Sequence, residues 1–272
     1  MMRQIVFITL FCVGVLSEAL FANVVEFVIV SPSYNNEAVC QASLQSIVSQ
    51  TYPYWSLVYI DDCSKDNTRM LVESFMLSKG VFHKCTLISN KKRLGAMENL
   101  YRVINKLPKD VIIVNLDGDD RFAHNDVLTR LANIYSDPNV WMTYGNYQEE
   151  PVGIASICAP FPQEVLDNAS FRAYAPWVSS HLKTYYAKLF QKIKKKDLME
   201  DGKFLSVASD VAFMFPILEM ASKGHIRFIP EVLYIYNRGN PLNDEKNHFK
   251  EVRRLDKKIR SKKRYERLDS LF

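Results

Sequence analysis

An apolar run that ends in a cluster of carboxylates constrains the fold of this chain most strongly. Residues 111–116 read VIIVNL and lead directly into Asp117-Gly118-Asp119-Asp120. A short, almost wholly apolar run is typical of a strand buried on both faces of a sheet. Three adjacent carboxylates repel one another, so we expect a cation to offset their charge, and Mg²⁺ or Mn²⁺ accept oxygen ligands of this kind. The alternative is an acidic turn that only caps the next helix.

Apolar runs alternate with helical patterns before this point. Three apolar runs end in polar turns, and each turn leads into a segment with helical spacing. The runs cover residues 24–31, 55–60 and 85–89, and the helical segments cover 39–50, 69–79 and a stretch that ends near residue 106. This order predicts a doubly wound, mostly parallel α/β sheet. Right-handed crossovers then bring the turns after the strands to one edge of the sheet.

Four polar turns should therefore converge, although they lie far apart in the sequence. Their polar residues are Tyr34 and Asn35, Asp61 and Asp62, Asn90 and Arg93, and Asp117 and Asp119. Ligands of open α/β sheets bind at the carboxyl ends of the strands. None of the four turns contains a GxGxxG motif or a P-loop lysine, so the sequence indicates neither a dinucleotide site nor an ATPase site.

The second half of the chain has a less regular pattern. We expect helices at 126–135 and 210–222, strands at 140–144 and 226–236, an irregular region at 151–176 and an amphipathic helix at 179–193. The tail from Glu245 has the composition of a charged helix with weak apolar spacing. No second long apolar segment follows the N-terminal one, so we expect no further membrane span.

The positive charge of the chain is concentrated in this tail. The formal net charge is +5, from 35 Lys and Arg against 30 Asp and Glu. Residues 245–268 contain 11 basic and 4 acidic residues, which leaves 24 basic and 26 acidic residues elsewhere. The body is therefore slightly acidic, and we expect no nucleic acid partner. The tail could contact an anionic membrane surface as a peripheral element, or it could be a solvated helix.

The N-terminus has the layout of a targeting segment. A basic start is followed by the apolar run 5–16 and then by small residues near position 22. Residues 1–22 are therefore predicted to be a secretory signal peptide or a retained N-terminal anchor. Either places the protein in the secretory pathway or at a membrane; a cytoplasmic location is the alternative.

Cysteine spacing excludes the common structural zinc sites. Cys40, Cys63, Cys85 and Cys158 follow the N-terminal segment without a CxxC motif. They are either buried small side chains or members of up to two disulfides.

The turns resemble those of family 2 glycosyltransferases, which have the GT-A fold. The matching blocks are Val30–Asn35 with Glu37, Ile60–Thr68, Asn90–Asn99 and Leu116–Asp120. Each block is weak alone, but their order and spacing over residues 24–122 are specific together. Cys63 departs from the glycine usual in the family. The resemblance implies the GT-A fold, and together with the residue patterns above it predicts a GT-A sheet with a helical acceptor side and a basic C-terminal helix.

The resemblance also implies roles for the turn residues. The nucleotide-sugar would be bound by Pro32, Tyr34, Asn35, Glu37, Asp61, Asp62, Asn90, Arg93, Asp117 and Gly118. Tyr34 would stack near the base, Asp61 or Asp62 would accept a hydrogen bond from it, and Arg93 would approach the ribose or phosphates. Asp119, with Asp117, would bind Mn²⁺ or Mg²⁺ on the diphosphate.

Asp210 is the candidate catalytic residue on the acceptor side. Relatives place a carboxylate at the start of a helix after a variable region, and Ser209-Asp210 precedes an apolar helical pattern here. An inverting transfer needs one group to take the proton of the acceptor hydroxyl. The alternatives are that Asp210 only caps its helix, or that the pair Glu200-Asp201 serves instead.

Three further residues are weaker candidates for the acceptor side. Arg238 stands where many relatives close over the diphosphate, and Trp177 and His181 could shape an acceptor pocket, although such aromatics are more often core residues. The QxxRW signature of processive relatives is absent, which favours transfer of single sugars.

These patterns predict a domain layout and an activity. We expect a signal or anchor at 1–22, a GT-A domain at 23–244 with a nucleotide-sugar half at 23–122 and an acceptor half at 123–244, and a basic helical tail at 245–272. The predicted activity is an inverting, metal-dependent transfer of one sugar from a nucleotide-diphosphate sugar, with UDP favoured, to a glycan, lipid-linked or protein acceptor. The alternatives are an exported non-catalytic sugar-nucleotide or glycan-binding protein and a nucleotidyltransferase.

Overall fold

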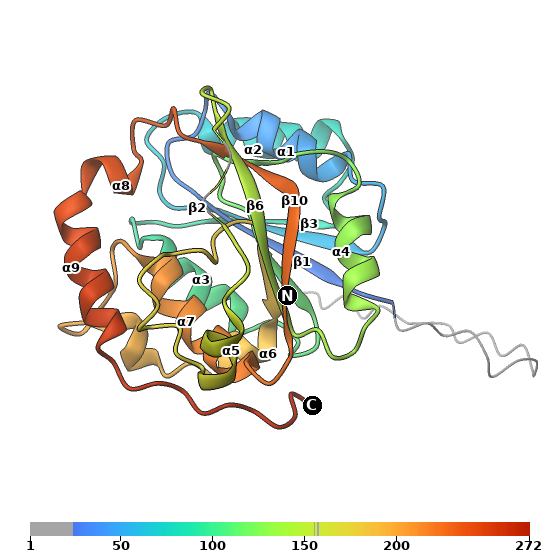
Figure 1. The fold of residues 1–272 in the computed structure, drawn as a ribbon. Coiled ribbons are helices and arrows are strands. Elements are labelled where there is room, and N and C mark those ends of the chain that lie inside the picture. Colours follow the sequence, from blue (N-terminus) through green and yellow to red (C-terminus); the bar gives the residue numbers. More distant parts are fainter. Residues whose placement is uncertain (1–23, 155, 157) are drawn as a thin grey trace, which may run out of the picture.

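An eight-stranded sheet forms the centre of the molecule (Figure 1). The computed structural model describes residues 24–154, 156 and 158–272, so the predicted signal or anchor at 1–22 lies outside the described residues. The strand order is β3-β2-β1-β4-β7-β6-β10-β5. The strands are β1 Phe27–Ser33, β2 Trp55–Asp61, β3 Cys85–Ser89, β4 Ile112–Asn115, β5 Arg121–Phe122, β6 Met142–Glu150, β7 Lys183–Tyr186 and β10 Ile226–Asn237.

The first four strands form the predicted parallel sheet. β1 pairs in parallel with β2 on one side and β4 on the other, and β2 pairs in parallel with β3. All seven residues of β1 are buried, as are all four of β4. Both strands have covered faces, which explains why their sequences are almost continuously apolar. The prediction of a mostly parallel α/β sheet is confirmed.

Residues 179–193 do not form the single amphipathic helix that their spacing predicts. Residues 183–186 are β7, which lies antiparallel between β4 and β6, and only α6, Ala187–Gln191, is helical. Tyr185 of β7 and Phe190 of α6 stack with their ring centroids 6.2 Å apart. β-branched and aromatic residues at 184–186 favour a strand, and here packing between two strands outweighs the helical spacing.

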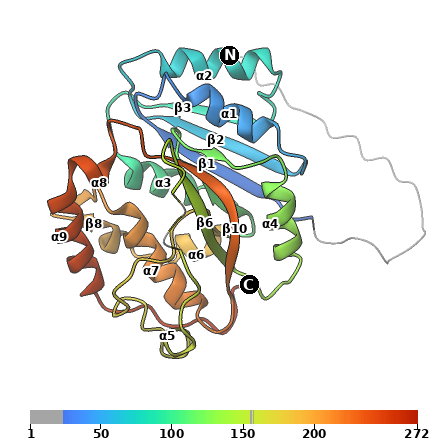
Figure 2. The ribbon, with the colours of Figure 1, turned by 45° about the horizontal axis from the view of Figure 1, so that its top comes forward.

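Helices cover both faces of the sheet (Figure 2). One face carries α1 Cys40–Val48, α2 Thr68–Ser78 and α4 Val127–Tyr135. The other carries α3 Ala96–Ile104, α6, α7 Ser209–Ala221 and α9 Phe249–Arg260. The apolar side chains form one core on each face, so the sheet is buried from both sides.

The region between β6 and β7 is largely irregular, as predicted. The described residues of this region include one short helix, α5 Gln163–Asn168. β6 extends to Glu150, well beyond the predicted end at Tyr144. The remaining short elements are η1 Lys195–Leu198, the hairpin strands β8 Met199–Glu200 and β9 Lys203–Phe204, and α8 Asp244–Asn247.

The tail is not one solvated helix, in contrast to the expectation from its charge. α9 ends at Arg260, and the segment 261–272 continues without helix along the body. Leu255, Ile259 and Leu271 are buried. The weak apolar spacing of the tail thus corresponds to a few anchoring side chains among many charged ones.

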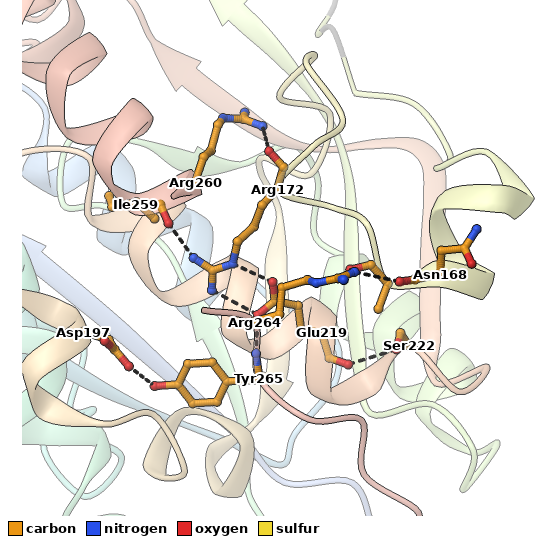
Figure 3. A network of polar contacts seen from close by, with 10 residues as sticks. Asn168, Arg172, Asp197, Glu219, Ser222, Ile259, Arg260, Arg264 and Tyr265 are labelled. Atoms are coloured by element: carbon orange, nitrogen blue, oxygen red, sulfur yellow. Dashed lines mark hydrogen bonds and ion pairs between the residues drawn. The ribbon is translucent and has the colours of Figure 1, made fainter. Parts of the chain in front are cut away.

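A buried ion pair fastens the tail to α7 (Figure 3). The Arg172 guanidinium donates to both carboxylate oxygens of Glu219, over 2.6 and 3.0 Å, and to the carbonyl oxygen of Ile259 over 2.6 Å. The Tyr265 backbone N–H donates to Glu219 over 2.9 Å. The side chains of Arg172 and Glu219 are 6% and 0% exposed, so each charge depends on the other.

The four described cysteines are unpaired. Cys40 and Cys85 are buried and Cys63 and Cys158 are partly exposed. None of these four forms a disulfide, and the alternative of buried small side chains holds for Cys40 and Cys85. None of the helices between residues 24 and 272 that the structure describes is long and apolar enough to cross a bilayer.

Candidate active site

Backbone hydrogen bonds between neighbouring strands continue into the four polar turns. The Asp62 N–H donates to the carbonyl of Ser33 over 2.8 Å, and the Asn90 N–H donates to the carbonyl of Asp61 over 2.9 Å. The Gly118 N–H donates to the carbonyl of Pro32 over 2.9 Å. The parallel ladder therefore runs past the ends of the strands. It brings the four predicted turns together at one edge of the sheet.

Side chains cross-link the first turn to the second. Asn35, in the left-handed region at φ 54°, accepts from the Lys65 N–H over 2.8 Å, and its own N–H donates to Ser64 over 2.9 Å. Glu37 accepts from the backbone and the side chain of Asn67, over 2.9 and 3.0 Å. Two predicted nucleotide-binding residues, Asn35 and Glu37, thus also hold the framework of the turns.

Asp62 links the second turn to the third. Its carboxylate accepts from the backbone N–H groups of Leu94 and Gly95, at 2.9 and 2.8 Å, and from the Asn90 side chain at 2.7 Å. Burial raises the pKa of Asp62, but hydrogen bonds from Asn99, Leu94, Gly95 and Asn90 outweigh it and hold the pKa below the usual range. Asp61 is also buried and accepts from the Ser64 N–H over 3.3 Å.

Tyr34 and Arg93 lie against each other at the same edge. The Arg93 guanidinium carbon is 4.0 Å from the centroid of the Tyr34 ring. Arg93 is exposed and Tyr34 is partly exposed, so both remain accessible from solvent. The structure thus pairs the residue predicted to stack near the base with the cation predicted to approach the ribose or phosphates.

The acidic turn requires a glycine at position 118. A Cβ built on Gly118 would lie 2.4 Å from Ser33 Cβ and 3.0 Å from the Ser33 Cα. Neither the backbone nor this side chain can yield easily, because the Ser33 hydroxyl accepts from Tyr59 and Asn36, at 2.8 and 2.9 Å. Gly118 therefore lets the turn after β4 lie directly against the end of β1.

The carboxylates of the acidic turn differ in burial and in partners. Asp119 accepts from the Asn240 amide over 2.5 Å, and burial raises its pKa. Asp120 is buried and accepts from the Tyr234 hydroxyl over 2.5 Å and the Asn237 N–H over 2.6 Å. Burial, together with the nearby charges of Asp119 and Asp117, raises the pKa of Asp120 well above its usual range. Asp120 thus ties the turn to β10.

Asp210 lies at the start of α7, as predicted, and a buried lysine accompanies it. The Lys183 ammonium nitrogen is 2.6 Å from Asp210 Oδ2. The Lys183 side chain is 1% exposed, whereas 35% of the Asp210 side chain is exposed. Burial raises the pKa of Asp210, but the charge of Lys183, the neighbouring His181 ring and the hydrogen bond from Lys183 outweigh burial, so the net direction is downward.

The strand register places Asp210 at the edge that carries the acidic turn. Lys183 stands opposite Asn115, which is the last residue of β4. His181 stacks on Tyr234 with ring centroids 4.4 Å apart, and Tyr234 is the donor to Asp120. The two acidic centres that the sequence identified separately, Asp210 and the acidic turn, therefore face one region of the molecule.

The weaker candidates have different surroundings. Trp177 packs against Phe215 at 5.5 Å between ring centroids, and Phe215 belongs to a core helix. Arg238 is 3.9 Å from Glu149. Glu200, in the rival pair, accepts from Arg254 and Lys258 on α9, over 2.9 and 2.5 Å. That carboxylate holds the hairpin β8–β9 to α9, far along the chain from the turns.

Lys183 and Asp120 have partners in the site that their sequence patterns do not indicate. A lysine in a run of strand-forming residues carries no signal of its own. Two carboxylates in succession, Asp119-Asp120, could have indicated that one of them needs a buried partner. The residue that donates to Asp120, Tyr234, lies 114 positions further along the chain.

The acidic turn has the donor set of a divalent-cation site. Among the described residues, no group of three or more His, Cys, Asp or Glu side chains could hold a metal ion by itself. Mg²⁺ is commonly held by one or two carboxylates together with substrate phosphates and water. Asp117 and Asp119 are partly exposed and supply hard oxygen ligands, so they fit an ion that arrives with a diphosphate.

Comparison with known proteins identifies sequence relatives. The model of the family described as "Glycosyl transferase family 2" matches residues 28–200. The chain is 33% identical over 142 residues to the Escherichia coli UDP-Glc:alpha-D-GlcNAc-diphosphoundecaprenol beta-1,3-glucosyltransferase WfgD, covering 52% of this chain and 53% of that protein. It is 31% identical over 140 residues to an uncharacterized glycosyltransferase of Haemophilus influenzae, covering 50% and 45%. The chain thus spans about half the length of these curated relatives.

Solved structures share the fold. Residues 1–349 of S. aureus TarS in complex with UDP-GlcNAc match with a TM-score of 0.58 and 18% identity, over 85% of this chain and 65% of that one. The mannosyltransferase PcManGT from Pyrobaculum calidifontis, in complex with GDP-Man and Mn²⁺, matches with a TM-score of 0.56 and 20% identity, over 88% and 66%. These matches confirm the predicted GT-A fold.

Proposed function

The chain belongs to glycosyl transferase family 2, and on that premise we propose that it moves a single sugar from a UDP-sugar to an acceptor hydroxyl, with inversion at the anomeric carbon. The family match favours sugar transfer over the nucleotidyl transfer that the sheet and its carboxylates alone leave open. UDP is favoured because the E. coli relative is named for UDP-Glc and the TarS structure contains UDP-GlcNAc.

One observation carries the proposal: a partly exposed carboxylate with a lowered pKa lies at the same sheet edge as the acidic turn. Asp210 is held by Lys183, and Lys183 stands opposite the last residue of β4, two residues before Asp117. The geometry supports a donor between Tyr34, Arg93 and the acidic turn, with the acceptor arriving from the side of Asp210.

The proposed reaction is a single displacement. The acceptor oxygen forms a bond to the anomeric carbon while the bond from that carbon to the diphosphate oxygen breaks. The Asp210 carboxylate takes the proton of the acceptor hydroxyl as the oxygen attacks. The nucleoside diphosphate leaves with both electrons of the broken bond, on the face opposite to the attack.

Asp117 and Asp119 would hold Mn²⁺ or Mg²⁺ in this proposal. A divalent cation bound there would neutralise negative charge on the leaving diphosphate. The Asn240 amide, 2.5 Å from Asp119, would help to orient the diphosphate, and the partly exposed Arg238, just after β10, would contribute a positive charge. Family membership and the Mn²⁺ of the similar PcManGT structure support this proposal.

We propose a lipid-linked glycan at a membrane surface as the acceptor, because the E. coli relative is named for a diphosphoundecaprenol acceptor.

α9 has a surface suited to peripheral contact with a membrane. Lys250, Arg253 and Lys257 are exposed and follow at spacings of three and four residues, so they share one side of the helix. Phe249 beside them is 51% exposed. Cations with an exposed aromatic favour an anionic lipid surface. A membrane location follows from this proposal.

Calorimetric titration with UDP, with and without Mn²⁺, tests the donor site. The variant Asp119→Ala should lose the metal-dependent part of the binding. Asp110→Ala is the matched control, because Asp110 is exposed and lies before the other end of β4. Metal-dependent binding that survives in Asp119→Ala would contradict the assigned site.

Turnover of a panel of UDP-sugars then tests the chemistry. Asp210→Asn should retain UDP binding and lose transfer or hydrolysis by about 100-fold or more. A wild type that binds UDP and turns over no nucleotide sugar would favour the non-catalytic binding protein.

A further inference from the structure

We propose that Lys183 is a positioning residue for the catalytic base: its buried ammonium group fixes one oxygen of Asp210 and keeps the carboxylate charged. This inference rests on the proposed function, because it assigns a role within that site. It adds a residue that lies on a different element from Asp210 and has no counterpart in the motifs of the sequence.

The contact geometry is specific. Lys183 Nζ donates to Asp210 Oδ2 over 2.6 Å and lies 3.2 Å from His181 Nδ1. Among the described residues, no hydrogen bond to the second oxygen, Oδ1, accompanies the bond to Oδ2. The carboxylate is therefore held at one oxygen, and the other oxygen is available to an acceptor hydroxyl.

A buried lysine is costly unless a counter-charge compensates it. The Lys183 side chain is 1% exposed, and an ammonium group taken from water into a protein interior loses several kcal/mol of solvation. Asp210 is its acidic partner in the described part of the chain. A core position between β4 and β6 would ordinarily hold an apolar side chain, so the lysine needs an explanation beyond packing.

His181 orients the Lys183 ammonium group toward Asp210. Burial, followed by the charge of Lys183, lowers the pKa of His181 to about 3, so the ring is neutral at physiological pH. A neutral ring can accept at Nδ1 from Lys183, which aligns the ammonium group toward Asp210. His181 is itself held by stacking on Tyr234 and Tyr236, at 4.4 and 5.5 Å between centroids.

The surroundings of Asp210 indicate in which direction the Lys183 charge moves the pKa of the carboxylate. The Lys183 charge lowers the pKa of Asp210, the neighbouring His181 ring acts in the same direction, and burial alone would raise it. The remaining neighbours are weak acids. Tyr185 has a pKa raised well above its usual range by burial, and the nearby Cys158 thiol also has a raised pKa, so both are neutral. Without the Lys183 charge, burial dominates and Asp210 would protonate at a higher pH.

The same contacts connect the base to the donor side. Asp120 accepts from Tyr234, Tyr234 stacks on His181, and His181 contacts Lys183. Each step is a direct contact between described side chains. Lys183 thus sets the position of Asp210 relative to the acidic turn and contributes its charge to the base.

The test compares Lys183→Met, Lys183→Arg and the control Lys192→Met, whose lysine is exposed just after α6. UDP binding is measured by calorimetry with Mn²⁺, and kcat and KM are measured from pH 4 to 9 with the UDP-sugar that the wild type turns over. Lys183→Met should lower kcat by about 100-fold, leave UDP affinity within about threefold, and move the acid limb of the kcat profile to higher pH. Lys183→Arg keeps a cation and should restore much of the acid limb, and Lys192→Met should match the wild type.

A folded Lys183→Met protein with wild-type kcat, or with a lower kcat and an unmoved acid limb, would overturn the inference. If Lys183→Met does not fold, Lys183→Gln retains a hydrogen-bond donor without the charge, and its acid limb must also move upward. Failure of the wild type to turn over any UDP-sugar would instead refute the proposed function, so the two failures are distinguishable.

Discussion

The proposed donor side and the proposed acceptor side of this molecule hold their polar groups in different ways. On the donor side, Asn35, Glu37 and Asp62 accept hydrogen bonds from backbone N–H groups of the neighbouring turn. On the acceptor side, Asp210 and Glu219 are held by buried cations, Lys183 and Arg172. The proposed donor side therefore relies on many backbone partners, whereas the proposed acceptor side relies on two ion pairs whose cations are buried.

This difference in hydrogen-bond partners explains why short sequence motifs can be recognised on the proposed donor side and not on the proposed acceptor side. A carboxylate that accepts from backbone N–H groups must stand at a fixed place in a short turn, so it recurs as a short sequence pattern. A buried ion pair joins residues from different elements, such as 172 with 219, which lie 47 positions apart. Only the folded chain brings them together. The comparison predicts that single substitutions should cost more on the acceptor side.

The largest effect should come from Glu219→Gln. It leaves the Arg172 charge buried without its partner, which typically costs about 3–5 kcal/mol in the free energy of unfolding. Denaturant titration measures this loss in the free energy of unfolding. The control Glu231→Gln breaks the Arg130–Glu231 pair, whose side chains are 45% and 51% exposed, and should cost less than about 1 kcal/mol. Equal losses in the two variants would remove the distinction between buried and exposed pairs.

An intermediate effect is expected for Asp62→Ala, on the donor side. It leaves the Leu94 and Gly95 N–H groups without their acceptor, at a cost of about 2–3 kcal/mol. The pKa of Asp62 is lowered by folding, so its stabilisation is present above its unfolded pKa and disappears as the pH falls through the folded value. The stability difference between wild type and variant should therefore begin to shrink as the pH falls below about 4 and continue to shrink at lower pH, whereas Glu73→Ala, an exposed control, should change stability little. A difference that stays constant as the pH is lowered from 5 to the acid limit of folding would contradict this account.

The smallest effect on stability should come from Arg93→Ala. A cation over an exposed ring contributes about 0.5–1 kcal/mol, so unfolding should change little. UDP affinity should fall more visibly, by about three- to tenfold if Arg93 approaches the ribose or phosphates. Lys92→Ala removes an exposed charge from the same turn, and an equal loss of affinity there would indicate a general charge effect instead.

Much of the donor side could be predicted from sequence, because its strands are apolar on both faces and its turns carry short patterns. The positions of Asp62, Gly118 and Asp119 follow from that order. β7 could not be predicted, because residues 179–193 satisfy helical spacing while packing between two strands decides their state. The roles of Lys183 and Asp120 depend on contacts with Asp210 and Tyr234, which no local pattern encodes.

The backbone pairing of β7 also determines where the chain can change length. Lys183 stands opposite Asn115, whereas the next residue, Thr184, hydrogen-bonds to Tyr135 on the α4 face of the sheet. Adjacent strand residues point to opposite faces, so one inserted or deleted residue within 183–186 would exchange the two. The lysine would then turn away from Asp210. Homologues of different length should accommodate their insertions in the irregular region before β7, while the four residues of the strand keep their spacing to β4.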